Sequence, residues 1–266
     1  MSHDFAGPMI RVEDLVTHYG DRLILNHVNL DFPTGETMVI LGGSGTGKST
    51  LLRHIMRLEM PTSGRILIKN HDICCMPEER FNLIRRKIGM LFQGAALFNS
   101  MTIEENVALP LRELTQLEDS TIRIMTRIKL DLVGLNGFEN YMPSELSGGM
   151  KKRAGLARAL AMDPEIILFD EPSAGLDPIT AAGIDSLILK LKNAFHVTIV
   201  VVTHELASAF VIADRITVMD HGEIIATGTP DEIRKSQHPR VLQFLNRTPD
   251  SDAIDQQEYL RSLTQT

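Results

Sequence analysis

A run of nine residues combines glycines, hydroxyl side chains and one lysine at a spacing suited to holding phosphate. It consists of Gly42, Gly43, Ser44, Gly45, Thr46, Gly47, Lys48, Ser49 and Thr50. The pattern G-x-x-x-x-G-K-S is typical of a loop whose backbone N–H groups surround anionic oxygens, because glycine reaches positive φ and has no Cβ. Lys48 is then expected to reach the β- and γ-phosphates of a nucleotide, and Ser49 to ligate Mg²⁺.

Two acidic residues close an apolar run further along the chain. Residues 164–169 read as a strand buried on both faces of a parallel sheet, and Asp170 and Glu171 follow at its carboxyl end. Ligands of α/β proteins bind at that edge of the sheet. The pattern predicts that Asp170 holds Mg²⁺, directly or through water, and that Glu171 is the general base for an attacking water.

Three single residues stand at positions where they can reach the same phosphate. Gln93 ends the apolar run 88–92 and is expected to coordinate the metal or the attacking water, with Gly94 as a hinge. His204 follows the strand expected over 197–203 and is a candidate for contact with the γ-phosphate. Tyr19 either stacks on an adenine ring or is an ordinary tyrosine at a strand end.

A second anion-binding pattern begins at Ser147. Ser147, Gly148 and Gly149 stand at the start of a helical stretch, where backbone N–H groups and a hydroxyl point toward an anion. The basic triplet 151–153 follows, and we interpret it as a solvated helix face rather than as a source of positive field.

The remaining pattern supplies the elements that position these residues. Residues 9–32 alternate in short bursts typical of antiparallel strands, 72–87 look helical, and 94–162 favour helix formers, which suggests a helical subdomain inserted into an α/β core. A helix over 179–195, a hairpin over 216–226 and a last helix opened by Thr229 follow. We expect one domain over 9–245, and a tail over 246–266 that frays or docks on a second subunit.

Composition limits the class of protein. With 266 residues, 43% of them hydrophobic, the chain can bury one α/β core and a small subdomain. The formal net charge of −7 argues against a nucleic-acid partner. Adjacent Cys74 and Cys75 suit a reducing compartment, and neither a signal peptide nor an apolar run of roughly 20 residues is evident. Any membrane role is therefore expected to come through a partner.

These motifs, in this order from Ile10 to about Leu245, resemble the nucleotide-binding subunits of ATP-binding cassette transporters. The resemblance rests on the phosphate loop, Gln93, His204 and the stretches 146–149, 170–171 and 176–177. It implies a P-loop NTPase core with an N-terminal antiparallel β-subdomain and an inserted helical subdomain, ATP hydrolysis, and a head-to-tail dimer. In that dimer Ser147, Gly148, Gly149 and Asp177 would complete the ATP site of the other subunit. Met150, where glutamine is common, and Ala174-Gly175, in place of Ser-Ala, depart from the pattern but leave the phosphate ligands and the base unchanged.

Within that family, the stretches 92–98, 105–113 and 143–180 resemble the subunits of Mla-type phospholipid transporters of Gram-negative envelopes, which work with MCE-domain proteins. The resemblance implies an integral membrane permease, an MCE-domain lipid-binding protein and a small STAS-type subunit as partners, and a place on the cytoplasmic side of the inner membrane. Amino-acid importers resemble this region less well.

Two alternatives belong to other functional classes. ATPases of chromosome maintenance and repair carry a long coiled coil, whereas the span from Lys48 to Ser147 contains no heptad repeat, and translation ATPases usually carry two cassettes. A signalling ATPase coupled to a membrane protein shares every motif, so the sequence leaves that alternative open.

Overall fold

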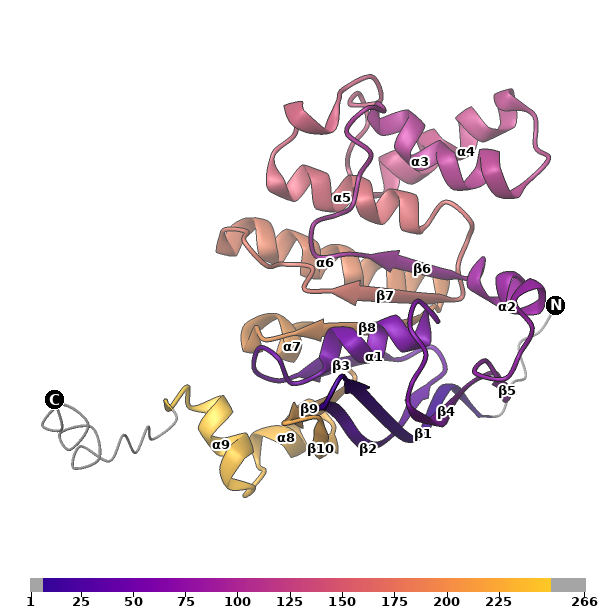
Figure 1. The fold of residues 1–266 in the computed structure, drawn as a ribbon. Coiled ribbons are helices and arrows are strands. Elements are labelled where there is room, and N and C mark those ends of the chain that lie inside the picture. Colours follow the sequence, from indigo (N-terminus) through magenta and orange to yellow (C-terminus); the bar gives the residue numbers. More distant parts are fainter. Residues whose placement is uncertain (1–6, 250–266) are drawn as a thin grey trace, which may run out of the picture.

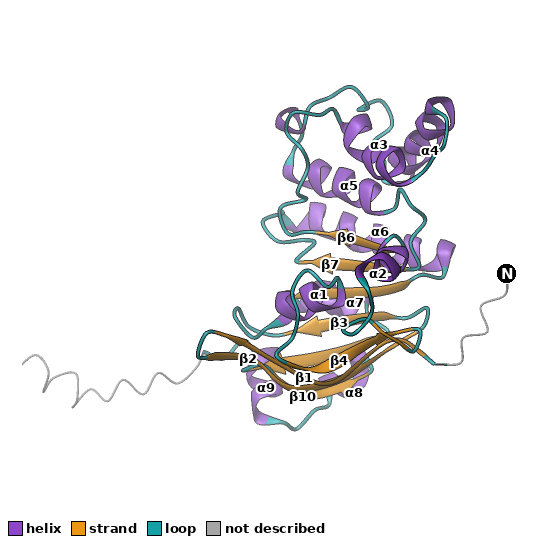
Figure 2. Cartoon of the chain, turned by 45° about the vertical axis from the view of Figure 1, so that its right-hand side comes forward, coloured by secondary structure: helices purple, strands orange, loops and turns teal. Residues whose placement is uncertain are grey.

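The computed structural model describes residues 7–249, which form two β-sheets and a set of helices. The smaller sheet has the strand order β2-β1-β4-β5, and its pairs are antiparallel. Its strands are β1 (Pro8–Tyr19), β2 (Arg22–Pro33), β4 (Ser63–Ile68) and β5 (His71–Asp72). The antiparallel strands expected over 9–32 are confirmed, and Figure 2 shows this sheet in the lower part of the molecule.

The larger sheet has the order β10-β9-β3-β8-β7-β6, with every neighbouring pair parallel except β9 and β10. Its strands are β3 (Thr37–Leu41), β6 (Ile88–Leu91), β7 (Ile166–Asp170), β8 (Thr198–Thr203), β9 (Arg215–Asp220) and β10 (Glu223–Gly228). Parallel strands end at a common edge, so the segments that follow β3, β6, β7 and β8 meet there.

Side chains from the two faces of this sheet enter different hydrophobic clusters. Along β3, Met38 and Ile40 pack with the smaller sheet, while Val39 and Leu41 pack with the helices on the opposite face. The alternation follows from the two-residue period of a strand, and burial on both faces explains the unbroken apolar run.

Helices cover the larger sheet and form a separate layer beyond β6 (Figure 1). The helices next to the sheets are α1 (Lys48–Ile55), α2 (Glu78–Arg85), α6 (Pro178–Phe195), α7 (Leu206–Ile212), α8 (Pro230–Arg234) and α9 (Pro239–Leu245). The separate layer contains α3 (Ile103–Leu114), α4 (Asp119–Leu132), the short 3-10 turn Pro143–Glu145 and α5 (Gly148–Ala159). The predicted fold class, an α/β core with an antiparallel β-subdomain and a helical subdomain, is confirmed.

Two details of the sequence interpretation need correction. The helix expected over 72–87 begins only at Glu78, after Pro77, which occupies its N-cap. The helix opened by Thr229 has the expected capping box with Glu232, but it is not the last one, because α9 begins at Pro239. The boundaries 9–245 and 94–162 stay predictions, and most of the predicted tail lies outside the described residues.

Candidate functional site

The phosphate loop lies between β3 and α1, as its motif requires. Gly47 occupies the N-cap of α1 with φ 96°, and a Cβ at this position would lie 2.6 Å from Leu25 Cδ2. The Lys48 ammonium lies inside the loop and donates to the carbonyl oxygens of Gly42 at 2.9 Å and Gly43 at 2.7 Å. Burial lowers the pKa of Lys48, while the negative charges of Glu171 and Asp170 raise it. The loop therefore surrounds a cation that faces two carboxylates.

Ser49 and Asp170 meet beside the loop. The Ser49 hydroxyl donates to Oδ1 of Asp170 at 2.8 Å, so a hydroxyl and a carboxylate oxygen converge at one point. Hard oxygen ligands of this kind fit Mg²⁺, which usually takes only one or two protein carboxylates and completes its shell with phosphate and water. Within residues 7–249 no group of three or more His, Cys, Asp or Glu side chains is placed to hold a metal.

Gln93 lies at the same edge of the sheet. It is exposed in a turn that follows β6, and no hydrogen bond found in the described part of the chain joins it to Ser49 or Asp170. A hydrogen bond thus joins two of the three predicted metal ligands.

Glu171 is fixed at the end of β7 by contacts to both its backbone and its side chain. Its φ of 49° lies in the left-handed region, and its N–H donates to the Val202 carbonyl at 3.0 Å. The Thr203 hydroxyl donates to Oε2 at 3.2 Å, and Nδ1 of His204 lies 2.9 Å from Oε1. The side chain is only 13% exposed. The carboxylate therefore has one fixed orientation at the edge where the phosphate loop lies, which is what a base that positions a water requires.

The sequence interpretation missed Lys152. This lysine was grouped with the solvated basic triplet, but it is only 5% exposed, and its Nζ donates to the backbone carbonyl of Glu171 at 2.9 Å. Burial lowers its pKa, and the charges of Asp170 and Glu171 raise it. The interpretation of the triplet as a solvated face is wrong for Lys152, because α5 turns this residue toward the end of β7.

Arg158, on the same helix, was also missed. Its guanidinium donates to the carbonyl oxygens of Ala96 at 2.7 Å and Ala95 at 2.9 Å, in the segment that follows Gln93. Both alanines have positive φ, a conformation that needs outside support in a residue with a Cβ. Arg158 therefore fixes the path of the chain just after Gln93.

Tyr19 lies beside the phosphate loop. A cavity of about 260 Å³ is lined by Tyr19, Arg22, Ile24, Gly45 and residues 47–50. The Tyr19 hydroxyl donates to the Glu59 carboxylate, and the side chain is 45% exposed, so part of it faces solvent. Arg22 lines this cavity and also a cavity of about 610 Å³ on the other side of the loop, which His204 reaches. Arg22 is a second cationic residue at the loop that the sequence interpretation did not select.

The second anion-binding pattern lies elsewhere in the chain. Ser147 caps α5, and its Oγ accepts the Met150 N–H at 3.3 Å, while Asp177 caps α6 by accepting from Ile179 and Thr180, each at 3.0 Å. Hydrogen bonds from the Thr180 side chain and backbone lower the pKa of Asp177. Neither cavity that borders the phosphate loop includes any residue of 147–149 or Asp177. Figure 1 shows why: α5 packs on β6, whereas α1 packs on β7 and β8.

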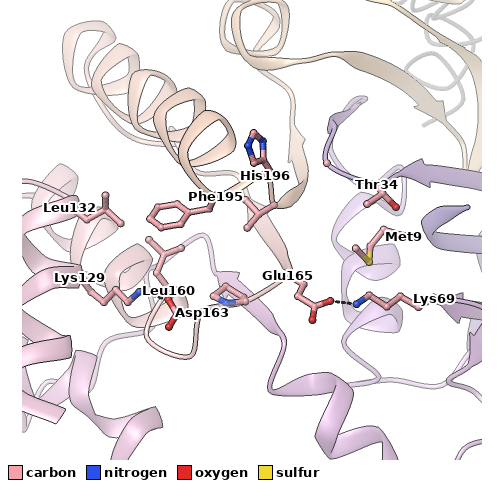
Figure 3. A pocket seen from close by; sticks show the side chains of 13 residues that line it. Met9, Thr34, Lys69, Lys129, Leu132, Leu160, Asp163, Glu165, Phe195 and His196 are labelled. Carbon is pink, nitrogen blue, oxygen red and sulfur yellow. Dashed lines mark hydrogen bonds and ion pairs between the residues drawn. The ribbon is translucent and has the colours of Figure 1, made fainter. Parts of the chain in front are cut away.

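Another cavity, of about 580 Å³, opens at the opposite edge of the sheet (Figure 3). Leu132, Leu160 and Phe195 line it beside two ion pairs, Lys129 with Asp163 at 2.5 Å and Lys69 with Glu165. Because each ammonium already has a carboxylate, this cavity lacks the unpaired positive field of a phosphate site.

A phosphate loop after a parallel strand, with an acidic pair closing a nearby strand, defines a P-loop nucleoside triphosphatase. The family model described as ABC transporter matches residues 25–174. The chain belongs to the ABC transporter family, as an ATP-binding subunit with ATPase activity.

Relatives and solved structures agree with this assignment. The chain is 42% identical over 258 residues to the intermembrane phospholipid transport system ATP-binding protein MlaF of Haemophilus influenzae, covering 96% of this chain and 98% of that protein. It is 44% identical over 241 residues to the probable ribonucleotide transport ATP-binding protein mkl of Mycobacterium leprae, covering 90% of this chain and 69% of that protein.

Among solved structures, the ATP-binding cassette MJ0796, a dimer in a post-hydrolysis state bound to ADP and Pi, superposes with a TM-score of 0.77 at 35% identity, covering 84% of this chain and 99% of that one. The protein cbiO1 of Clostridium perfringens, part of an ABC transporter complex, superposes with a TM-score of 0.79 at 30% identity, covering 90% and 99%. Among residues 7–249, no helix has the length and apolar character that crossing a membrane requires.

Proposed function

We propose that this chain is the ATPase subunit that powers phospholipid transport across a Gram-negative envelope through a membrane permease. The observation that carries the proposal is 42% identity across nearly the whole length of a protein named for intermembrane phospholipid transport. The partners are an integral membrane permease, an MCE-domain lipid-binding protein and a small STAS-type subunit. The chain then lies at the cytoplasmic side of the inner membrane and is attached through the permease.

The helical layer supports a docking role. Exposed apolar side chains occur on α3, α4 and the segments beside them, where a protein partner would cover them. They are Phe98, Leu114, Leu117, Ile124, Ile128 and Tyr141, each between 39% and 61% exposed.

We assign each residue of the proposed ATP site a role that the geometry at the sheet edge supports. Tyr19 stacks on the adenine, residues 42–50 surround the phosphates, and Lys48 offsets the charge that spreads over the γ-phosphate. When bound, Mg²⁺ supplies further charge neutralisation at the phosphates, held by Ser49 and Asp170 with Gln93 as a third ligand. Glu171 orients and activates the attacking water, and His204 contacts the γ-phosphate while holding the Glu171 carboxylate.

The remaining site residues come from a second copy of the chain. Ser147, Gly148, Gly149 and Asp177 lie away from their own phosphate loop, and they complete the ATP site of the partner in a head-to-tail dimer. Support comes from the dimeric state stated for the similar cassette MJ0796.

Replacing the base tests the catalytic assignment. Glu171→Gln keeps the size of the side chain but removes the proton acceptor, so we expect the ATPase rate to fall at least about 100-fold while ATP binding persists. Glu165→Gln is the matched control, because Glu165 lies at the opposite end of the same strand. Hydrolysis by the Glu171 variant at the wild-type rate would remove this residue from the base role.

The substrate assignment is tested by purifying the chain with its membrane partners in mild detergent and analysing what is bound. A permease that carries phospholipid supports the proposal. A partner without a lipid-binding path would overturn it.

A second candidate substrate has a specific observation in its favour. The relative mkl, 44% identical, is named for probable ribonucleotide transport. The purified complex also distinguishes the two candidates. Its ATPase activity is measured after reconstitution, with phospholipid or ribonucleotide added. A rate that rises with ribonucleotide and not with phospholipid would favour ribonucleotide transport.

A further inference from the structure

Lys152 joins the helix that begins at Ser147 to the residue that acts as the base. It lies on α5, and its Nζ donates to the Glu171 carbonyl at 2.9 Å. The side chain is 5% exposed, so its ammonium has lost most of its water. A buried ammonium is unfavourable unless carboxylates and acceptors compensate it, and Asp170 and Glu171 provide that charge. Such an arrangement indicates a specific role for this side chain.

The Glu171 backbone needs support from outside β7. Its φ of 49° is a conformation that residues with a Cβ adopt only when the surroundings hold it. Val202 holds the N–H, and the carbonyl accepts from Lys152 and from the Ala174 N–H at 3.2 Å. Among these contacts, Lys152 alone belongs to α5.

We propose that Lys152 is a positioning residue that places Glu171 of its own subunit from the helix whose N-terminus completes the ATP site of the partner. The proposal rests on the proposed function, which assigns the base role to Glu171 and the action across the dimer to Ser147. A movement of α5 toward the phosphate of the partner is passed through the Lys152 hydrogen bond to the Glu171 backbone. Lys152 therefore ties the alignment of the Glu171 base to the position of α5 in the same subunit.

Removing the ammonium tests the positioning role. In Lys152→Met the burial and length of the side chain stay similar, but the donor is lost. We expect kcat to fall about 10- to 100-fold, the range that follows from a displaced catalytic group, with KM for ATP changed less than about twofold. Lys152→Arg keeps charge and donors and should restore at least part of kcat. If the methionine variant does not fold, Lys152→Gln, whose amide is too short to reach the same carbonyl, takes its place.

A matched control separates positioning from general stabilisation. Lys129 on α4 is also a buried lysine, and its Nζ meets Asp163 at 2.5 Å at the edge of the sheet away from the phosphate loop. Lys129→Met should lower the melting temperature without the selective loss of kcat. Equal kinetic effects of the two substitutions would overturn the proposal.

Mixed dimers show in which subunit Lys152 acts. In the first mixture, one subunit carries Lys152→Met and the other carries Lys48→Ala, so the single intact phosphate loop belongs to the subunit without Lys152. In the second, one subunit carries both substitutions and its partner is wild type. Both are compared with a dimer of wild-type and Lys48→Ala subunits. We expect the first mixture to lose activity and the second to keep it. Loss in the second mixture, or no loss in either, would overturn the proposal.

The outcome for Glu171→Gln keeps the two hypotheses apart. If Glu171→Gln hydrolyses ATP at the wild-type rate, the assignment of the base fails. If it is inactive while Lys152→Met behaves like Lys129→Met, only the positioning role of Lys152 fails.

Discussion

Gly149 is the residue at which one added methyl group should disrupt the proposed second half of the ATP site. A Cβ at Gly149 would lie 2.4 Å from Cγ2 of Thr180, whose hydroxyl donates to Asp177 at 2.5 Å and limits its rotation. Gly149→Ala should therefore push the start of α5 away from α6 and lower the ATPase rate about 100-fold, the loss typical of a misplaced anion-binding donor. Thr180→Ser removes Cγ2 and keeps the hydroxyl, so the double variant should regain most activity in a steady-state assay. A single variant as active as the wild type, or a double variant as poor as the single, would contradict this prediction.

Residues whose chemistry resides in one short stretch were predictable from the sequence. The phosphate loop and the pair Asp170 and Glu171 each follow an apolar run. Such a run predicts a buried parallel strand, and its carboxyl end gives the edge of the sheet at which the residues lie. Lys152 was not predicted, because its partner is the backbone carbonyl of Glu171, which lies 19 residues further along the chain, and residue type gives no signal for such a contact. A signal was nevertheless present: Gly149, Lys152 and Leu156 follow the spacing of one helix face, and all three are buried.

At the scale of elements, Asp185 lies on α6, whose N-cap is Asp177, and α6 packs on α7, which follows His204. Asp185 is 7% exposed, and its Oδ1 has no hydrogen-bond partner within the described residues. Burial raises the pKa of Asp185, the Ser208 side chain lowers it, and the charge of Glu205 raises it. The folded chain therefore holds this proton to a higher pH than the unfolded chain does, and the free energy of unfolding decreases as pH rises from about 4 through the raised pKa.

Asp185→Asn removes this titration and keeps the size of the side chain. We expect the variant to exceed the wild type in stability above the raised pKa by about 1 kcal/mol, or about 2–4 °C in Tm, and the gain to vanish toward pH 4. Thermal melts over a pH series measure the difference. Ser208→Ala should lower stability at high pH, because the Ser208 side chain lowers the pKa of Asp185 and so favours its charged form. A loss of stability in Asp185→Asn that is equal at every pH would contradict the prediction.

Element types were more predictable than element ends. The capping box of Thr229 with Glu232 fixed the start of α8, and the run 179–195 matched α6 within one residue. The helix expected from 72 failed because an irregular segment and Pro77 precede Glu78, and charge pattern alone does not detect such a segment. Helix α9 was missed because seven residues give too little periodicity, although Pro239 at its start was a usable signal.

At the scale of the whole molecule, the two halves of the proposed ATP site do not meet within one chain. The phosphate loop, Asp170, Glu171 and His204 converge at the edge of the larger sheet, while Ser147 lies at the start of α5 beyond β6 (Figure 1). The sequence pattern predicts that the phosphate loop follows a strand and that Ser147 begins a helix. It does not give the distance between the phosphate loop and Ser147. That separation depends on how the helical layer packs on β6, which is a tertiary property.

Complementation between two inactive variants follows from this separation. Lys48→Ala disables the phosphate loop, and Ser147→Arg places a bulky side chain at the cap of α5, so each variant alone should fall about 100-fold below the wild type in ATPase rate. In their mixed dimer, one ATP site receives an intact loop from one subunit and an intact Ser147 from the other, so mixing should restore activity up to half the wild-type rate. The control pairs a subunit carrying both substitutions with a wild-type subunit: the variant content is the same, but each site then contains one damaged half and should stay inactive. Isolated mixed dimers, selected with two affinity tags, measure both rates. An active control beside an inactive mixed dimer would show that each chain builds its ATP site alone, and the head-to-tail dimer would have to be abandoned.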